Sequence, residues 1–438
     1  MSRRLPDALA GLVVLVAASR LAAADLAALG GCRPVDRPYD AVEVPGAALR
    51  LKRSAISRLG VLAFRGGTPA PVPFQVDERR GRKLALADGP EPTADDQPGT
   101  IDADDLVVVL PCDLGEAASP DAVTRAAGEG SMWREVRVRD PVDGTTGFAY
   151  VVASDAPPRT DRRYVAYTPA GDFVQTAAYR VGLVNALPTY LATVHGGSPG
   201  PNLLDGLRLR AEAHLRGNLA RFTLDEQRGR HSLVAWRAGP VRTIRRSRHW
   251  IALPAGIQIS AGLAHTYFYP RHVFGPGSLK LPFSPGIFFN DIHAFGGADG
   301  RDLRGWRYHA PGVPPAGFAI DGHMDDAEKA FSGSGDWFVL AGKNEALLFV
   351  TRMSPELARV VPLELVYRDD AERPNPPEAE PGTVPLVGYE GRGVEQLPKG
   401  RYTFAIRILF LDGYRPGDER RLLAQIDQPL EVDVPAQG

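Results

Sequence analysis

The chain has 438 residues, of which 44% are hydrophobic and 24% are charged, a composition typical of a globular protein with two or three domains. Its formal net charge of −1 at pH 7 argues against nucleic acid as a partner. With 47 glycines and 39 prolines, the sequence favours turns over long helices, and therefore β structure.

The first 24 residues predict a secretory signal peptide. Arg3 and Arg4 form a basic start, and the apolar run over residues 8–18 is too short to span a bilayer. Small residues at Ala22 and Ala24 predict cleavage after residue 24. We therefore expect an exported protein, periplasmic or extracellular, with no transmembrane segment after the signal is removed.

Two cysteines, Cys32 and Cys112, are the only ones in the chain. In an oxidising compartment such a pair predicts one disulfide. The alternative is that "LGGC", ending at Cys32, is a lipoprotein-processing box that lipidates this cysteine. Arg20 and Asp25 interrupt the apolar stretch that such a box requires, so we favour the disulfide over lipid anchoring.

Period-two alternation of apolar and polar residues recurs along the chain, as in residues 207–215 and 402–410. Residues 133–140 and 146–154 alternate in the same way around a turn at Asp143-Gly144, which predicts a hairpin. Helical spacing appears only briefly, near residues 120–127, 325–331 and 354–359. The predicted fold class is mainly β, with two or three antiparallel β-sandwich-like domains, long irregular loops and few short helices.

Proline-rich stretches suggest the domain boundaries. We expect an N-terminal β domain over 25–155 with the disulfide, a central β domain over 164–312, and a C-terminal β domain over 313–438. Residues 270–335 show little periodicity, which predicts a long irregular segment. Because such segments often carry function, we expect part of the site there.

An arginine-rich region spans residues 208–271, with twelve arginines and three acids. Arginines that alternate on strands suit the carboxylate or sulfate groups of an acidic glycan. The predicted substrate-binding residues are Arg245, Arg248, His249, Trp250 and, further along the chain, Trp306. The alternative is that the arginines pair with acids of the same protein.

Catalytic candidates follow from two possible reactions. For a polysaccharide lyase, His265, Tyr267 and His272 would transfer the proton beside a uronate carboxylate. For a glycoside hydrolase, Asp291 and Asp325 would form the required carboxylate pair. The alternative for Tyr267 is a structural role, as an aromatic residue that packs in the core from a β-strand.

A metal site is a further hypothesis. In "DGHMDDAE", Asp321, His323 and Asp325 offer ligands for calcium or zinc, which His293 could join if the two segments meet. The alternative is that Asp325 or Asp326 caps a short helix. The acidic run over residues 88–105 is interpreted as a solvated loop, with a weak calcium site as its alternative.

The preferred hypothesis is an exported β-sandwich protein that binds an acidic or polyhydroxylated glycan; whether it also cleaves the glycan stays open. One alternative is a non-enzymatic scaffold that docks a partner protein through a strand edge or an apolar patch. The other is a metal-dependent enzyme centred on His293 and His323.

Overall fold

The computed structural model of the chain is 48% strand and 12% helix, which confirms the predicted mainly β fold class. It describes residues 26–29, 31–51, 54–217, 220–226, 228–252, 258–301, 303–372 and 384–436. The predicted signal peptide, residues 1–24, lies outside these ranges. No helix within them is long and apolar enough to cross a membrane.

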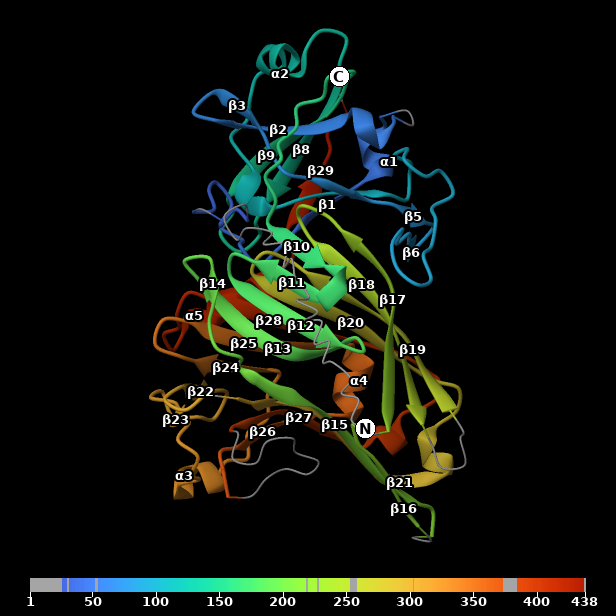
Figure 1. The fold of residues 1–438 in the computed structure, drawn as a ribbon, viewed down its shortest axis with the longest axis vertical. Helices are drawn as coiled ribbons and strands as arrows, with labels where there is room; N and C mark the ends of the chain where they lie inside the picture. The colour runs from blue at the N-terminus through green and yellow to red at the C-terminus, as the bar shows by residue number, and fades with distance from the viewer. Residues whose placement is uncertain are drawn as a thin grey trace, which may run out of the picture.

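Two small sheets, of order β1-β7-β4 and β29-β8-β9-β2-β3, enclose a core of their own (Figure 1). We call these two sheets the N-terminal unit, although β29 comes from the other end of the chain. The strands are β1 (Val42–Pro45), β2 (Leu59–Arg65), β3 (Thr68–Pro71), β4 (Gln75–Asp77), β7 (Leu106–Val109), β8 (Met132–Arg139), β9 (Thr146–Ala153) and β29 (Glu431–Asp433). Strands β8 and β9 form the predicted hairpin.

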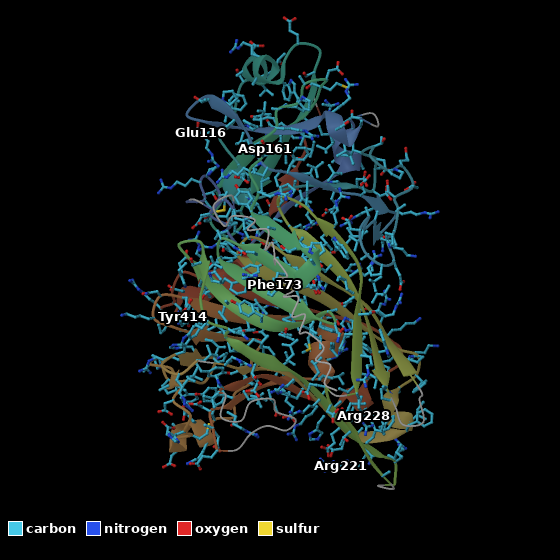
Figure 2. The ribbon with its side chains drawn as sticks, in the orientation of Figure 1. Glu116, Asp161, Phe173, Arg221, Arg228 and Tyr414 are labelled. Carbon is cyan, nitrogen blue, oxygen red and sulfur yellow. A yellow bond between two sulfur atoms is a disulfide. The ribbon has the colours of Figure 1, made fainter. Side chains whose placement is uncertain are left out.

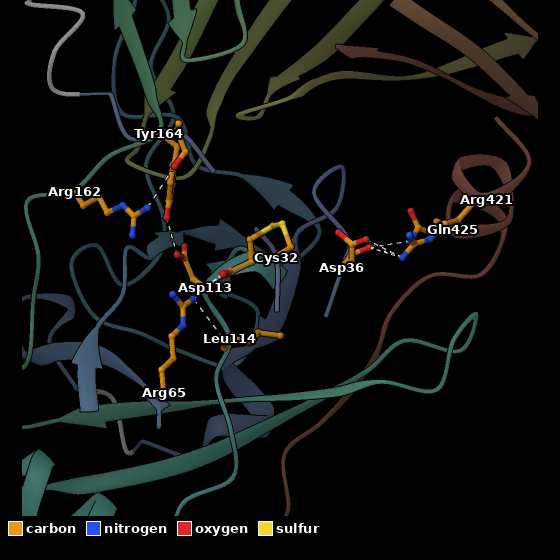
Figure 3. Close-up of a disulfide and its surroundings, with 11 residues drawn as sticks. Cys32, Asp36, Arg65, Asp113, Leu114, Arg162, Tyr164, Arg421 and Gln425 are labelled. Atoms are coloured by element: carbon orange, nitrogen blue, oxygen red, sulfur yellow. Dashed lines mark hydrogen bonds and ion pairs between the residues drawn. A yellow bond between two sulfur atoms is a disulfide. The ribbon is translucent and has the colours of Figure 1, made fainter. Parts of the chain in front are cut away.

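The disulfide between Cys32 and Cys112 is present, as predicted, and joins residues 80 positions apart (Figure 3). Beside it the Tyr164 hydroxyl donates to the Asp113 carboxylate at 2.6 Å, and Arg65 donates to the Cys112 carbonyl at 2.7 Å. Such a crosslink could stabilise the fold by about 4 kcal/mol. The Cys32 sulfur is therefore not free to carry a lipid, and the disulfide is compatible with an exported protein.

The largest sheet has nine antiparallel strands in the order β17-β18-β19-β20-β28-β25-β24-β22-β23. They are β17 (Gly229–Ala238), β18 (Thr243–Ala252), β19 (Gln258–Phe268), β20 (His272–Leu281), β22 (Arg307–His309), β23 (Phe318–Ala319), β24 (Trp337–Ala341), β25 (Ala346–Met353) and β28 (Gly400–Leu411). The alternating residues 402–410 lie in β28, near the middle of this sheet, as a strand prediction requires.

Two five-stranded sheets cover one face of the nine-stranded sheet. They have the orders β10-β11-β12-β13-β14 and β16-β15-β21-β27-β26. Their strands are β10 (Val165–Thr168), β11 (Phe173–Thr176), β12 (Tyr179–Val184), β13 (Leu187–His195), β14 (Ser198–Pro199), β15 (Leu204–Leu215), β16 (Arg221–Leu224), β21 (Phe289–Gly300), β26 (Leu363–Arg368) and β27 (Leu386–Arg392). Tyr179 stacks on Phe410 with ring centroids 4.1 Å apart, and Tyr389 packs on Phe338 at 5.4 Å. The result is a β-sandwich with one shared core.

The helices are short. Figure 2 labels Phe173 near the middle of the molecule and Arg221 near its lower end. The five α-helices of the described residues are α1 (Gly46–Leu49), α2 (Pro120–Ala127), α3 (Asp326–Lys329), α4 (Pro355–Val360) and α5 (Asp418–Asp427). The 3₁₀ turns are η2 (Ile56–Arg58), η3 (Pro111–Asp113), η4 (Pro169–Gly171), η6 (Pro285–Ile287) and η7 (Val394–Gln396). Helices α2, α3 and α4 lie where helical spacing was found. Helix α5 was not predicted, and it packs on the other face of the nine-stranded sheet.

The prediction that residues 270–335 are irregular is wrong for much of that segment. Strand β20 pairs with β28 along ten residues, and β21 lies between β15 and β27. Runs such as Gly275-Pro276-Gly277 have no side-chain alternation, which is why the sequence pattern misses these strands. Strands from the predicted 164–312 and 313–438 ranges also share two sheets of the sandwich, the nine-stranded sheet and the sheet β16-β15-β21-β27-β26, so we describe these ranges together.

Arg242 is fully buried where the N-terminal unit meets the nine-stranded sheet. Its Nε donates to Asp77 of β4 at 2.8 Å, and its Nη1 donates to both Glu43 of β1 and the Tyr269 hydroxyl. The Gln75 side-chain oxygen accepts the backbone N–H of Arg242 at 2.9 Å. The Asp77 side chain is also fully buried. The opposite charges of Arg242 and Asp77 therefore compensate each other across the junction, where neither is accessible to water.

Replacing Asp77 by Asn should lower the free energy of unfolding by about 3–5 kcal/mol, because the buried Arg242 charge then loses its main partner. Denaturant-induced unfolding measures the change. Asp155→Asn is the matched control, since it breaks an exposed ion pair with Arg58 and should cost less than about 1 kcal/mol. Equal stability of the two variants would contradict the importance of the buried pair.

Candidate functional site

Strand β19 separates from one of its neighbours, and pockets open along it. β18 and β19 pair along nearly their whole length. On its other side β19 pairs with β20 only at Tyr267↔Phe274 and Phe268↔Val273. Residues of the remaining part of β19 line two pockets, and Leu263 borders both. Four predicted site residues line these pockets: His265 and Tyr267 line one, and His249 and Trp250 line the other.

The larger pocket has a volume of about 1090 Å³ and lies between β19 and a short hairpin of β5 (Arg79–Arg80) and β6 (Lys83–Leu84). We call it the basic pocket, because six cationic side chains line it and only one acid, Asp95, does. The cations are Arg79, Arg80, Arg82, Lys83, Arg246 and Arg401. Gly81, in the turn of the hairpin, has a φ of 63°, a backbone conformation that favours glycine.

Four of these cations are solvent-exposed and unpaired. Arg80, Arg82, Lys83 and Arg401 are exposed, and within the ranges that the structure describes none of them forms an ion pair or hydrogen bond through its side chain. Their charges are therefore available to a ligand. A local concentration of positive charge in a nearly neutral protein attracts anions to this pocket.

Arg246 is a positioning residue of the basic pocket. Its Nε donates to Nε2 of His265 at 2.9 Å, one Nη donates to the Leu84 carbonyl at 2.7 Å, and the other donates to the Thr93 hydroxyl at 3.1 Å. The hydrogen bonds to Leu84 and Thr93 hold β6 and the segment that follows it against β18. Burial, and secondarily the Arg246 charge, lower the pKa of His265 to about 4. The ring is therefore neutral at pH 7, with its proton on Nδ1.

Tyr267 lies on the same face of β19, two residues after His265, and also lines the basic pocket. Burial raises the pKa of its hydroxyl, although the charge of Arg242 acts in the opposite direction. The Arg242 guanidinium carbon lies 5.2 Å from the centroid of the ring. Tyr267 is therefore a neutral phenol at physiological pH.

The second pocket has a volume of about 450 Å³, and we call it the apolar pocket. Its walls are mainly Leu187, Leu207, Leu209, Leu224, Trp250, Ile251, Leu263, Phe295 and Phe404. Nδ1 of His231 lies 2.7 Å from Nδ1 of His249, whose Nε2 lies 2.6 Å from Oγ of Ser247. Burial, with His231 as a smaller cause, lowers the pKa of His249 to about 4. Ser247 is only 5% exposed, so the hydroxyl in this series of hydrogen bonds is not an accessible nucleophile.

Two of the predicted binding arginines are already paired. Arg245 is 2% exposed and donates to the Asp172 carboxylate. Arg248 makes two hydrogen bonds to Glu91, at 2.7 and 2.6 Å. Both lie on β18 as expected, but their contacts fit the alternative of pairing within the protein, and we leave them out of the candidate site.

Two further predicted residues lie away from both pockets. His272 is 4% exposed and stacks on Tyr269 with ring centroids 4.3 Å apart, and its burial lowers its pKa well below the usual value. Trp306 packs at the edge of the main core. Neither residue lines the basic or the apolar pocket.

Asp291 and His293 do come together, on β21. Nε2 of His293 lies 2.7 Å from the Asp291 carboxylate, and Nδ1 lies 3.3 Å from Glu390. The hydrogen bond to His293 lowers the pKa of Asp291. Among the described residues, no hydrogen bond or ion pair joins this group to Asp325, the other carboxylate of the predicted hydrolase pair.

The "DGHMDDAE" segment is the capped start of α3. The Asp325 carboxylate accepts the backbone N–H of Glu328 at 2.8 Å, and the Glu328 carboxylate accepts that of Asp325 at 2.8 Å. Asp321 accepts the backbone N–H of His323 at 2.9 Å. In the described part of the chain, the side-chain groups close enough to share a metal ion include none of Asp321, His323, Asp325 and His293. The contacts fit the capping alternative.

The cations of the β5–β6 hairpin were missed by the sequence analysis. Residues 79–83 read "RRGRK", which places four cations in five positions. This run is a usable sequence signal of a basic surface turn, although the arginines of residues 208–271 are more numerous. Only the fold shows that the short run and His265 face one pocket.

No protein-family model and no curated protein sequence matches this chain. Among solved structures, it is similar to an α-mannosidase from Enterococcus faecalis V583, with a TM-score of 0.41 and 8% identity over 90% of this chain and 47% of that one. It is also similar to a protein in the glycosyl hydrolase family 38 from Enterococcus faecalis, with a TM-score of 0.40 and 9% identity over 91% of this chain and 46% of that one.

A third similar structure, HI1317, has a TM-score of 0.31 and 8% identity, over 57% of this chain and all of that one. The chain thus spans less than half of the length of the two Enterococcus proteins. At such low identity and TM-score, these likenesses carry no argument about function.

The lowered histidine pKa values predict acid sensitivity. His249 and His265 have a pKa of about 4 in the folded chain and about 6.5 when unfolded, so unfolding takes up protons between pH 4 and 6.5. Their contribution to stability is complete above pH 6.5 and is lost as the pH falls toward 4. The slope of unfolding free energy against pH should therefore be shallower in His249→Gln and His265→Gln, by up to about 1.4 kcal/mol per pH unit each.

Urea unfolding at several pH values measures these slopes. Above pH 7 the profiles of the variants and the wild type should run parallel, which separates proton linkage from a uniform loss of stability. Identical slopes between pH 4 and 6.5 would mean that neither ring is held neutral.

Proposed function

We propose that this protein is an exported glycan-binding protein whose basic pocket takes an acidic, polyhydroxylated glycan. The observation that carries the proposal is the group of exposed, unpaired cations around one pocket: Arg80, Arg82, Lys83 and Arg401. Guanidinium groups bind carboxylate and sulfate groups through paired hydrogen bonds, so a glycan that carries such groups matches this surface.

The size and the surroundings of the basic pocket support a chain-like ligand. Its volume of about 1090 Å³ lies just above the usual range for small-molecule sites, roughly 300–1,000 Å³. His265 and Tyr267 supply neutral donors suited to sugar hydroxyls. The near-zero net charge of the whole chain disfavours nucleic acid, the other common polyanion.

The chemistry of the pocket favours binding over elimination. A lyase needs a base with a free lone pair beside the uronate. The Nε2 lone pair of His265 is occupied by Arg246, and burial raises the pKa of Tyr267, so its hydroxyl keeps its proton. A glycoside hydrolase of the usual kind needs two carboxyl groups, whereas Asp95 is the one acid in the lining.

Export is supported by two independent features. The predicted signal peptide directs the chain out of the cytosol. The Cys32–Cys112 disulfide is of the kind that persists in oxidising compartments. A glycan of a cell surface or of the surroundings would be accessible to the protein there.

Binding of polygalacturonate, alginate and heparin, with neutral dextran as a reference, tests the proposal. Calorimetry should show binding of at least one acidic polymer and none of dextran, with an affinity that falls as NaCl is raised. The double variant Arg80→Gln/Lys83→Gln should bind at least about tenfold more weakly, because it removes two unpaired charges. Arg125→Gln, an exposed arginine of α2, is the matched control and should bind as the wild type does.

Two outcomes would overturn the proposal. One is equal binding of acidic and neutral polymers, and the other is unchanged affinity in the double variant. Elimination, the lyase reaction, is checked by incubating each acidic polymer with the protein and measuring the ultraviolet absorbance of unsaturated uronate. Formation of that product would replace binding with lyase activity.

A further inference from the structure

Five aspartates gather in the segment between β6 and β7. We call Asp95, Asp96, Asp102, Asp104 and Asp105 the aspartate cluster. One carboxylate oxygen from each of Asp95, Asp102 and Asp105 lies within 4.8 Å of the other two, and the same holds for Asp96, Asp102 and Asp104. A calcium ion with oxygen ligands at about 2.3–2.6 Å fits between oxygens at such separations.

One buried carboxylate oxygen of the aspartate cluster has no hydrogen-bond donor within the described ranges. Asp95 is only 8% exposed, and its Oδ1 has no hydrogen-bond partner among the described residues. Asp105 is fully buried beside it. A buried carboxylate oxygen without a donor costs free energy, which a bound cation would recover. In the part of the chain that the structure describes, no arginine or lysine forms an ion pair with any member of the aspartate cluster.

We propose that Asp95, Asp102 and Asp105 bind one calcium ion. This trio contains the unpartnered oxygen and the two buried carboxylates, whereas Asp96 of the other trio is exposed. Oxygen ligands alone, without histidine or cysteine, favour a hard cation. Calcium accepts an irregular arrangement of ligand oxygens, whereas magnesium requires a near-octahedral one, so this site suits calcium better. An exported protein meets calcium at concentrations that serve even a weak site.

The calcium site would also hold the basic hairpin. The Asp105 carboxylate accepts the backbone N–H of Arg79 at 2.9 Å, and the Asp104 carboxylate accepts that of Gly81. Asp95 belongs both to the aspartate cluster and to the lining of the basic pocket. Calcium would thus fix the β5–β6 hairpin against β19. The existence of the site does not rest on the proposed glycan function.

Calcium titration of the metal-free full-length protein tests the proposal. Calorimetry should show one calcium ion per chain, and 10 mM calcium should raise the Tm by about 2 °C or more, with a smaller rise in 10 mM magnesium. Asp95→Asn should weaken calcium affinity at least about tenfold. Asp88→Asn, an exposed aspartate of the same segment outside the aspartate cluster, is the matched control and should bind as the wild type does.

Absence of stoichiometric calcium binding by the wild type would overturn the proposal, as would a magnesium response equal to that of calcium or an Asp95→Asn variant with wild-type affinity. If Asp95→Asn fails to fold, Asp102→Asn takes its place, and the wild-type titration still decides. These readouts contain no glycan, so their failure is distinguishable from a failure of the proposed function.

Discussion

The buried ion pair between Arg242 and Asp77 is the constraint on which the arrangement of this protein depends. Two charges without access to water are tolerated only when each faces the other in a fixed position. Arg242 immediately precedes β18 and Asp77 ends β4, so the pair defines how the N-terminal unit sits on the nine-stranded sheet. Glu43 and Tyr269 hydrogen-bond the same guanidinium, which leaves little freedom for an alternative docking geometry.

This fixed junction explains where the basic pocket lies. One residue separates Asp77 from the β5–β6 hairpin, and β19 pairs with β18, the strand that begins immediately after Arg242. The sandwich does not contain the pocket by itself, because four of its six cations come from the β5–β6 hairpin, whereas His265 and Tyr267 come from β19 of the sandwich. The aspartate cluster supports the hairpin from behind through backbone hydrogen bonds. The cations of the basic pocket are thus held in place by β19 and by a hairpin turn that the aspartate cluster anchors.

Local sequence patterns predicted much of the fold. The features that they missed depend on contacts between segments far apart in the sequence. Alternation over residues 207–215 and 402–410 marked β15 and β28. The strands were found although the alternation does not match burial throughout, since Leu209 and Ile406 are exposed and Arg208 is buried. β21 was missed because glycines such as Gly297, which packs against the backbone of Gly388, replace the expected apolar side chains. Within the candidate site, His265 was recognisable from local chemistry, whereas its closeness to residues 79–83 depends on contacts between segments far apart in sequence.

Strand β29 has a consequence for how the chain is made. It pairs with β8, with Val432 opposite Val138, and occupies an edge of a sheet whose other strands lie before residue 154. During synthesis those strands emerge long before their last neighbour, and until then the backbone groups of β8 face outward along an open edge. Open edges recruit strands from other molecules. A nascent or truncated chain therefore exposes an aggregation-prone border that the finished protein covers with its own tail.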